Sequence, residues 1–128
     1  MRGWWLSTPA RKAVLIVEDD SDLAEMMEIV IASEDYPVEK ALNGLEALEI
    51  VRRQMPGLIL LDMKMPVMDG WEFASRFREE FDQSAPIVVV TAAADARVRA
   101  MEVGTPGFLP KPFEIDDLLS CVQRFYRD

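Results

Sequence analysis

The sequence predicts an α/β fold in which five strands form one parallel sheet and five helices cover its two faces. Four runs of apolar residues, at 13–17, 57–61, 86–90 and 107–110, lack the alternation of a half-exposed strand, and segments with helical spacing separate them. Strands that alternate with helices form βαβ units, and a parallel sheet is buried on both faces. These two observations together predict a doubly wound sheet.

The first half of the chain supplies three strands and two helices. The strand at 13–17 is followed by a helix over 21–34, a weak extended piece at 36–41, a helix over 43–54 and the strand at 57–61. One face of the first helix is apolar, because these residues follow the spacing i, i+3, i+4, i+7, i+8: Leu23, Met26, Met27, Val30 and Ile31. The second helix carries a shorter stripe of Leu45, Leu48 and either Val51 or Arg52.

The second half supplies three helices and two strands. A helix over 69–81 precedes the strand at 86–90, a helix over 94–104 precedes the strand at 107–110, and a helix over 114–126 ends the fold. In the first of these helices phenylalanines recur every four residues, and we interpret them as core packing: Phe73, Phe77 and Phe81. The apolar residues of 94–104 spread around the helix and define no single buried face.

The length of 128 residues fits one domain, which we place at residues 12–128. Residues 1–11 are expected to form an N-terminal tail, in which Trp4 and Trp5 either dock on a surface or belong to a disordered start. No apolar run approaches the roughly 20 residues of a membrane span, and the start lacks the apolar core of a secretory signal. With a single cysteine, Cys121, the sequence fits a reducing compartment, and we expect a cytoplasmic protein.

The chain is acidic, with a formal net charge of −9. Nonspecific binding to nucleic acids or to anionic membranes requires a surplus of lysine and arginine, so the charge argues against both. The sequence contains no histidine, which excludes histidine metal ligands, Ser-His and Cys-His nucleophilic pairs, and a role as a histidine phosphodonor. Any chemistry must therefore use carboxylates, lysine and hydroxyl groups.

Polar residues follow the predicted strands at the same end. Glu18 and Asp19 follow the first strand, Asp62 the third, Thr91 the fourth and Lys111 the fifth. The carboxyl ends of parallel strands meet at one edge of the sheet, where ligands of such folds bind. Clustered carboxylates need a cation, and an all-oxygen ligand set favours Mg²⁺. A carboxylate nucleophile, a hard cation, a lysine and a hydroxyl are the parts of a phosphoryl-transfer site.

The acidic cluster also has a simpler interpretation. Asp20 and Ser21 lie where the helix over 21–34 begins, and a solvated loop that caps this helix would by itself explain the acidic residues. The presence of Asp62 and Lys111 at matching strand ends favours the cation site. Asp20 and Ser21 are expected to cap the helix in either case.

Four motifs, "VLIVEDD", "LILLDMKMPVMDG", "VVVTA" and "GFLPKPF", resemble in this order the receiver domain of two-component response regulators. The likeness covers residues 12–127 and is closest in kind to the single-domain chemotaxis regulators. It implies a flavodoxin-like (βα)5 fold with strand order 2-1-3-4-5. It also implies that Asp62 accepts a phosphoryl group from a histidine kinase or a histidine phosphotransfer protein.

The resemblance assigns a Mg²⁺ site around the phospho-acceptor. Asp62 and Asp19 are the direct ligands that it implies, and Glu18 the ligand that acts through water. The backbone carbonyl of Lys64 completes the set. The side chain of Lys64, two residues after the acceptor, borders the path of the attacking water in such domains.

The resemblance also assigns the residues that respond to the phosphoryl group. Lys111 pairs first with the acceptor carboxylate and then with the phosphoryl group, and its bond to Pro112 is expected to be cis. Thr91 is the switch hydroxyl, and the backbone N–H of Ala92 is a further donor. Phe108 occupies the aromatic switch position, where tyrosine is commoner, so its ring can pack but offers no hydroxyl.

The implied output is altered protein binding at a surface made of the fourth strand, the fourth helix, the fifth strand and the fifth helix. Such a chain catalyses only its own phosphorylation and dephosphorylation and is not an enzyme in the usual sense. One alternative is a receiver-like module that binds partners without phosphorylation, although the complete acidic and lysine set argues against it. Another is a Mg²⁺-dependent phosphatase with an aspartate nucleophile, which would need a second aspartate where this chain has Lys64.

Overall fold

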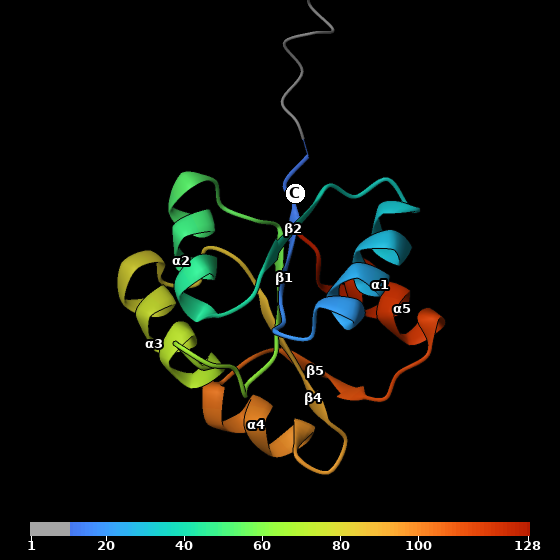
Figure 1. The fold of residues 1–128 in the computed structure, drawn as a ribbon. Coiled ribbons are helices and arrows are strands. Elements are labelled where there is room, and N and C mark those ends of the chain that lie inside the picture. The colour runs from blue at the N-terminus through green and yellow to red at the C-terminus, as the bar shows by residue number, and fades with distance from the viewer. Residues whose placement is uncertain (1–10) are drawn as a thin grey trace, which may run out of the picture.

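The computed structural model describes residues 11–128 and confirms the predicted α/β architecture (Figure 1). Its five parallel strands are arranged in the order β2-β1-β3-β4-β5. The strands are β1 (Val14–Val17), β2 (Val38–Ala41), β3 (Leu58–Leu61), β4 (Ile87–Ala92) and β5 (Gly107–Lys111). The helices are α1 (Ser21–Ala32), α2 (Gly44–Arg53), α3 (Gly70–Phe81), α4 (Ala96–Val103) and α5 (Ile115–Phe125).

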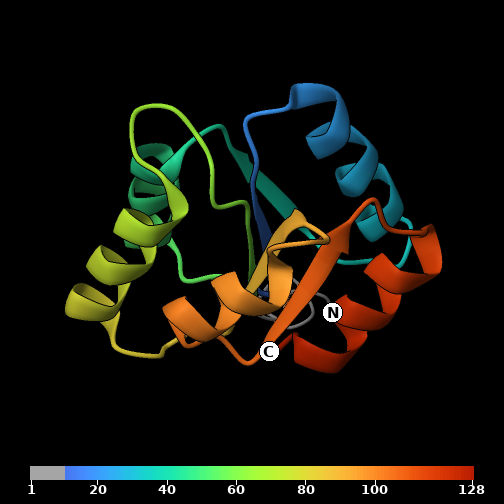
Figure 2. The same ribbon diagram turned by 90° about the horizontal axis from the view of Figure 1, so that it is seen from below.

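Helices cover both faces of the sheet, as Figure 2 shows. The side chains of successive strand residues point to opposite faces. Val14 and Ile16 of β1 accordingly pack with the buried residues of α1 and α5. Leu15 and Val17 pack with those of α2, α3 and α4. Since each face meets a helical layer, every residue of β1 and of β3 is buried, which explains why their sequences do not alternate.

The predicted helical faces are largely confirmed. Met27 and Ile31 of α1 are fully buried, and so are Phe73 and Phe77 of α3. The prediction for Leu45 of α2 is wrong, because its side chain is 44% exposed. The buried residues of α2 are Gly44, Ala47, Leu48, Ile50 and Val51. Ala47 is fully buried, although the sequence stripe did not include it.

Two strand ends extend further than predicted. β4 continues to Ala92 and β5 continues to Lys111, so Thr91 and Lys111 lie within strands and are fixed by sheet pairing. Asp20 caps α1 as expected, because its carboxylate accepts hydrogen bonds from the backbone N–H groups of Asp22 and Leu23. The strands and the helix cap therefore hold the candidate site residues in defined positions.

The expected tail lies mostly outside the described residues, and so do Trp4 and Trp5. Arg11 is described, and its guanidinium lies 4.6 Å from the ring centre of Tyr36 and 5.2 Å from that of Tyr126. The Tyr126 hydroxyl donates a hydrogen bond of 2.6 Å to the carbonyl oxygen of Lys12. Within residues 11–128, no helix has both the length and the apolar character needed to cross a membrane.

Candidate functional site: an acidic pocket at the carboxyl edge of the sheet

Three carboxylates meet at the carboxyl ends of β1 and β3, which are neighbours in the sheet. Glu18 and Asp62 are buried, with 3% and 7% of their surface exposed, whereas Asp19 is exposed. One carboxylate oxygen from each of the three lies within 4.8 Å of the others. We call Glu18, Asp19 and Asp62 the acidic pocket. The structure thus brings together the three side chains that the sequence placed at strand ends.

Lys111 lies close to two of these carboxylates. Its Nζ atom is 2.6 Å from Oε1 of Glu18 and 3.7 Å from Oδ2 of Asp62. The resemblance predicted the pair with Asp62, and the structure contains it, but the shorter contact is with Glu18. One ammonium group therefore offsets part of the repulsion between two buried carboxylates.

The electrostatics of the acidic pocket favour added positive charge. Burial raises the pKa of Glu18 to about 7, although the Lys111 ammonium and the backbone N–H of Asp20 act in the opposite direction. Burial also raises the pKa of Asp62 above its ordinary value, against the effects of Lys111 and of the N–H groups that follow Asp62. Lys111 alone therefore does not compensate the desolvation of two buried carboxylates.

The donor set fits a hard divalent cation. All the side-chain donors in the acidic pocket are carboxylate oxygens, which Mg²⁺ prefers, and the exposed Asp19 leaves one side open to water ligands. The nearby Lys111 is a point charge that can approach a phosphoryl oxygen without competing as a ligand. The pocket can therefore hold both a hard cation and an anionic group beside Asp62.

A hollow of about 560 Å³ opens beside Asp62 and Lys111. Thr91 and Ala92 of β4 line it, and Thr91 is buried while Ala92 is exposed. Ala92 lies directly opposite Lys111 in the sheet, and the Lys111–Pro112 bond is cis, as predicted. Apolar side chains complete the hollow: Leu23, Met26 and Phe113. Sequence reasoning assigned Leu23 and Met26 only to the apolar face of α1, and nothing in that ordinary helical stripe indicates that these two side chains also line the hollow.

Phe108 lies on β5, three residues before Lys111, and its side chain is half-buried. The guanidinium of Arg97, in the first turn of α4, lies 5.4 Å from the centre of the Phe108 ring. A cation above an aromatic face is attracted to it. Sequence reasoning missed Arg97, because nothing in the ambiguous segment 94–104 distinguishes it from an ordinary surface arginine.

Residues 14–123 match the family model described as the response regulator receiver domain. The chain belongs to the response regulator receiver family. It is 36% identical over 116 residues to the response regulator MprA of Mycobacterium leprae, a match that covers 89% of this chain and 50% of that protein. The chain therefore spans about half the length of the curated relatives it matches.

Solved receiver structures have the same fold. The chemotaxis protein CheY4 of Vibrio cholerae has a TM-score of 0.80 and 32% identity, over 91% of this chain and 99% of that one. The signal receiver domain of a signal transduction histidine kinase from Syntrophus aciditrophicus also has a TM-score of 0.80 and 32% identity, over 89% of both chains. Phosphorylation of an aspartate is the function of this family of receiver domains, which work with histidine kinases or phosphotransfer proteins.

Proposed function

We propose that this receiver takes a phosphoryl group on Asp62 from a histidine kinase or a histidine phosphotransfer protein. The observation that carries the proposal is the buried position of Asp62 within the acidic pocket, 3.7 Å from the Lys111 ammonium. A carboxylate at the tip of an apolar strand is costly to desolvate unless a cation or hydrogen bonds compensate it, so its presence there favours a functional role. In this proposal the Asp62 carboxylate is the nucleophile.

The transfer is a simple displacement at phosphorus. An Oδ atom of Asp62 forms a new bond to phosphorus, while the bond between phosphorus and the donor's histidine nitrogen breaks and that nitrogen keeps the electron pair. Lys111 neutralises charge on the phosphoryl oxygens, and the Thr91 hydroxyl and the N–H of Ala92 donate hydrogen bonds to them. In the later hydrolysis, a water oxygen forms a bond to phosphorus, the bond between phosphorus and Oδ of Asp62 breaks, and inorganic phosphate leaves, which restores the Asp62 carboxylate.

Mg²⁺ is the cofactor that this donor set suits. Asp19 and Asp62 would bind it directly, Glu18 through water, and Lys64 through its backbone carbonyl. When bound, Mg²⁺ supplies positive charge opposite the phosphoryl oxygens. Asp62 keeps its reactive ionised form more readily when its neighbours in the acidic pocket share a cation, because burial otherwise raises the pKa of its carboxyl group.

The output of the switch is a change in protein binding. As Thr91 moves toward the phosphoryl group, Phe108 turns inward and alters the surface formed by β4, α4, β5 and α5. This surface carries exposed apolar side chains that suit a protein partner: Val98 at 48%, Met101 at 75% and Ile115 at 54% exposure. Its partner is a protein, and neither a nucleic acid nor a membrane suits so acidic a chain.

Intact-mass measurement after incubation with acetyl phosphate tests the proposal. We expect a Mg²⁺-dependent gain of one phosphoryl group, which Asp62→Asn abolishes. Asp116→Asn, at an exposed position of α5, is the matched control and should behave as the wild type. A wild-type chain that binds Mg²⁺ but gains no phosphoryl group, from acetyl phosphate or from a phosphorylated histidine domain, would contradict the assignment of Asp62. Turnover of a generic phosphomonoester would instead favour the phosphatase.

A further inference from the structure

Helix α4 has little apolar contact with the rest of the domain. Its buried side chains are only Ala96, Ala100 and Val103, and two of these are alanines. The N-cap residue, Asp95, forms no side-chain hydrogen bond to the first turn of the helix. Short side chains bury little area, so apolar packing alone holds α4 weakly. Besides its packing against β4 and β5, α4 is held by polar contacts with α3.

Trp71 of α3 makes the first of these contacts. Its indole Nε1 donates a hydrogen bond of 3.1 Å to Oε1 of Glu102 on α4. The guanidinium of Arg99 lies 5.4 Å from the Trp71 ring centre and pairs with the same glutamate at 2.5 Å. The bonds from Arg99 and Trp71 hold the pKa of Glu102 below its ordinary value. This arrangement has a cost, because Nε of Arg99 is buried with no hydrogen-bond partner among residues 11–128.

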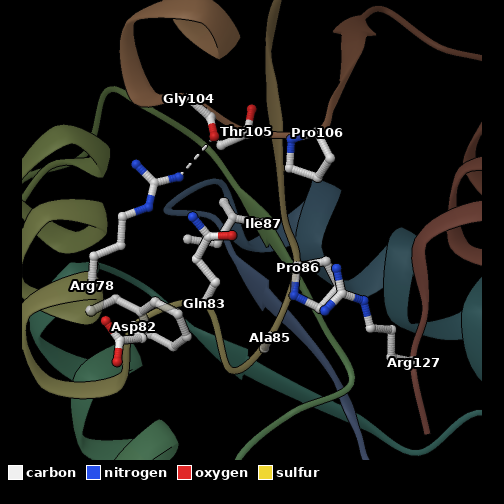
Figure 3. Close-up of a pocket in the computed structure, with 11 residues that line it drawn as sticks. Arg78, Asp82, Gln83, Ala85, Pro86, Ile87, Gly104, Thr105, Pro106 and Arg127 are labelled. Atoms are coloured by element: carbon white, nitrogen blue, oxygen red, sulfur yellow. Dashed lines mark hydrogen bonds between the residues drawn. The ribbon is translucent and has the colours of Figure 1, made fainter.

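Arg78 of α3 makes the second contact, and Figure 3 shows its hydrogen bond to Gly104. Its guanidinium donates hydrogen bonds to the carbonyl oxygens of Val103 and Gly104, the latter at 3.1 Å. These carbonyls form the C-terminal end of α4, where the helix carries partial negative charge and where a cation is favourable. Arg78 of α3 therefore caps the C-terminal end of α4.

Two hollows that are open to solvent border Arg78. A hollow of about 210 Å³ lies between the end of α3 and the segment after α4, and Arg78 and Gly104 line it (Figure 3). A second hollow of about 450 Å³ lies between α3 and α4, lined by Trp71 and Arg78. Dense packing makes elements move together, so these hollows leave α4 attached to α3 mainly through polar contacts.

We propose that Trp71 and Arg78 form a clasp that fixes the C-terminal half of α4 on α3, and that the strength of this clasp sets how readily the domain adopts its phosphorylated conformation. The clasp contacts residues 99–104, whereas the first turn of α4 follows Thr91 through a short connection. The helix can then pivot about its held end when Thr91 moves. This proposal rests on the proposed function for the role of Thr91. A weaker clasp lowers the free-energy cost of the phosphorylated conformation. It therefore shifts the population of the domain toward that conformation.

Hydrogen exchange of α4 tests the clasp without any phosphorylation. Arg78→Met removes both bonds to the carbonyl oxygens but keeps an apolar stem, and Trp71→Phe removes the indole donor but keeps an aromatic ring. Arg76→Met is the matched control, because Arg76 lies on the same helix, is exposed, and pairs with Glu72 of α3. Exchange of α4 amides should become about five- to tenfold faster in Arg78→Met and Trp71→Phe. Peptides from β1, β3 and α5 should keep the wild-type rate, which verifies the fold.

Binding of beryllofluoride, a phosphoryl analogue, in the presence of Mg²⁺ tests the coupling. Arg78→Met should reach half-saturation at a concentration several-fold lower than Arg76→Met or the wild type. The proposal is overturned if α4 exchanges no faster in Arg78→Met than in Arg76→Met, or if it exchanges faster with no change in beryllofluoride affinity. A wild type that neither gains a phosphoryl group nor binds beryllofluoride, while Arg78→Met still loosens α4, would refute the proposed function and the coupling but not the clasp itself.

Discussion

Lys111 and Glu18 form the shortest ion pair of the acidic pocket, with 2.6 Å between Nζ and Oε1. Even so, burial keeps the pKa of Glu18 at about 7, well above its ordinary value of 4.5. The folded chain therefore retains a proton on Glu18 that the unfolded chain releases between these two pH values. The contribution of Glu18 to the free energy of unfolding is therefore greatest at low pH, and it falls as the pH rises from about 4.5 to about 7.

Glu18→Gln should remove this pH dependence. In EDTA at pH 8, we expect the variant to have a free energy of unfolding about 1–3 kcal/mol above that of the wild type, because it no longer buries that charge. The free energies of unfolding of the variant and the wild type should become nearly equal near pH 5. Urea unfolding at a series of pH values measures the effect, with the exposed Glu34→Gln as control. Parallel curves for Glu18→Gln and the wild type would show that Glu18 does not titrate in this range.

Mg²⁺ should stabilise the folded chain. A ligand that binds only the folded state at about 100 times its dissociation constant adds roughly 2.7 kcal/mol to the free energy of unfolding. Asp19→Asn should greatly reduce this gain in the free energy of unfolding, because Asp19 is a carboxylate of the acidic pocket that we propose as a direct ligand of the ion. Urea unfolding with and without Mg²⁺ provides the measurement. Asp22→Asn, another exposed position near the start of α1, should retain the full gain, and an equal loss in both variants would contradict the specific role of Asp19.

Val67 has a backbone conformation that its side chain disfavours. Its φ angle is +69°, its side chain is 77% exposed, and the N–H of Met68 donates to the carbonyl oxygen of Pro66 across it at 2.8 Å. A β-branched residue in this region is strained, and its exposure means that little packing is lost on replacement. Val67→Gly should therefore raise the free energy of unfolding by about 1 kcal/mol in urea. Val67→Ala keeps a Cβ and should gain less, and a destabilised glycine variant would show that the turn carries no strain.

Cys121 should stay protonated in the folded chain well above the pH at which a free thiol ionises. Burial raises its pKa from 9.0 to about 11. The unfolded chain loses this proton first, so stability from this group falls as the pH rises from about 9 to about 11. The difference in free energy of unfolding between the wild type and Cys121→Ala should be constant below pH 9 and shift by about 1–3 kcal/mol above it. A difference that stays constant up to pH 11 would mean that the thiol ionises at its ordinary pH.

The sequence predicts the acidic pocket well because strand ends have a fixed geometry. A buried parallel strand has an apolar sequence, and the residue after it must lie at the carboxyl edge of the sheet. That rule alone places Glu18, Asp62 and Lys111 together, and the structure agrees. The resemblance adds the strand order, which hydrophobic patterns do not encode.

Contacts between helices could not be predicted in the same way. Leu45 fits the apolar stripe of α2 as well as Leu48 does, yet its side chain is exposed, whereas Ala47, which the stripe did not include, is buried. Likewise, nothing local to Arg78 indicates that it reaches carbonyl oxygens of another helix. Such contacts depend on how two elements meet in space, and a one-dimensional pattern contains no such information.

The ion pair between Glu18 and Lys111 joins residues that are 93 positions apart in the sequence. Chains emerge from the ribosome amino end first, so the carboxylates of the acidic pocket are synthesised long before their lysine. Until β5 pairs with β4, the nascent domain holds its carboxylates without that ammonium. The last strand of the sheet thus completes the fold and also supplies the ammonium group of the acidic pocket, and a chain cut off after β4 would lack both.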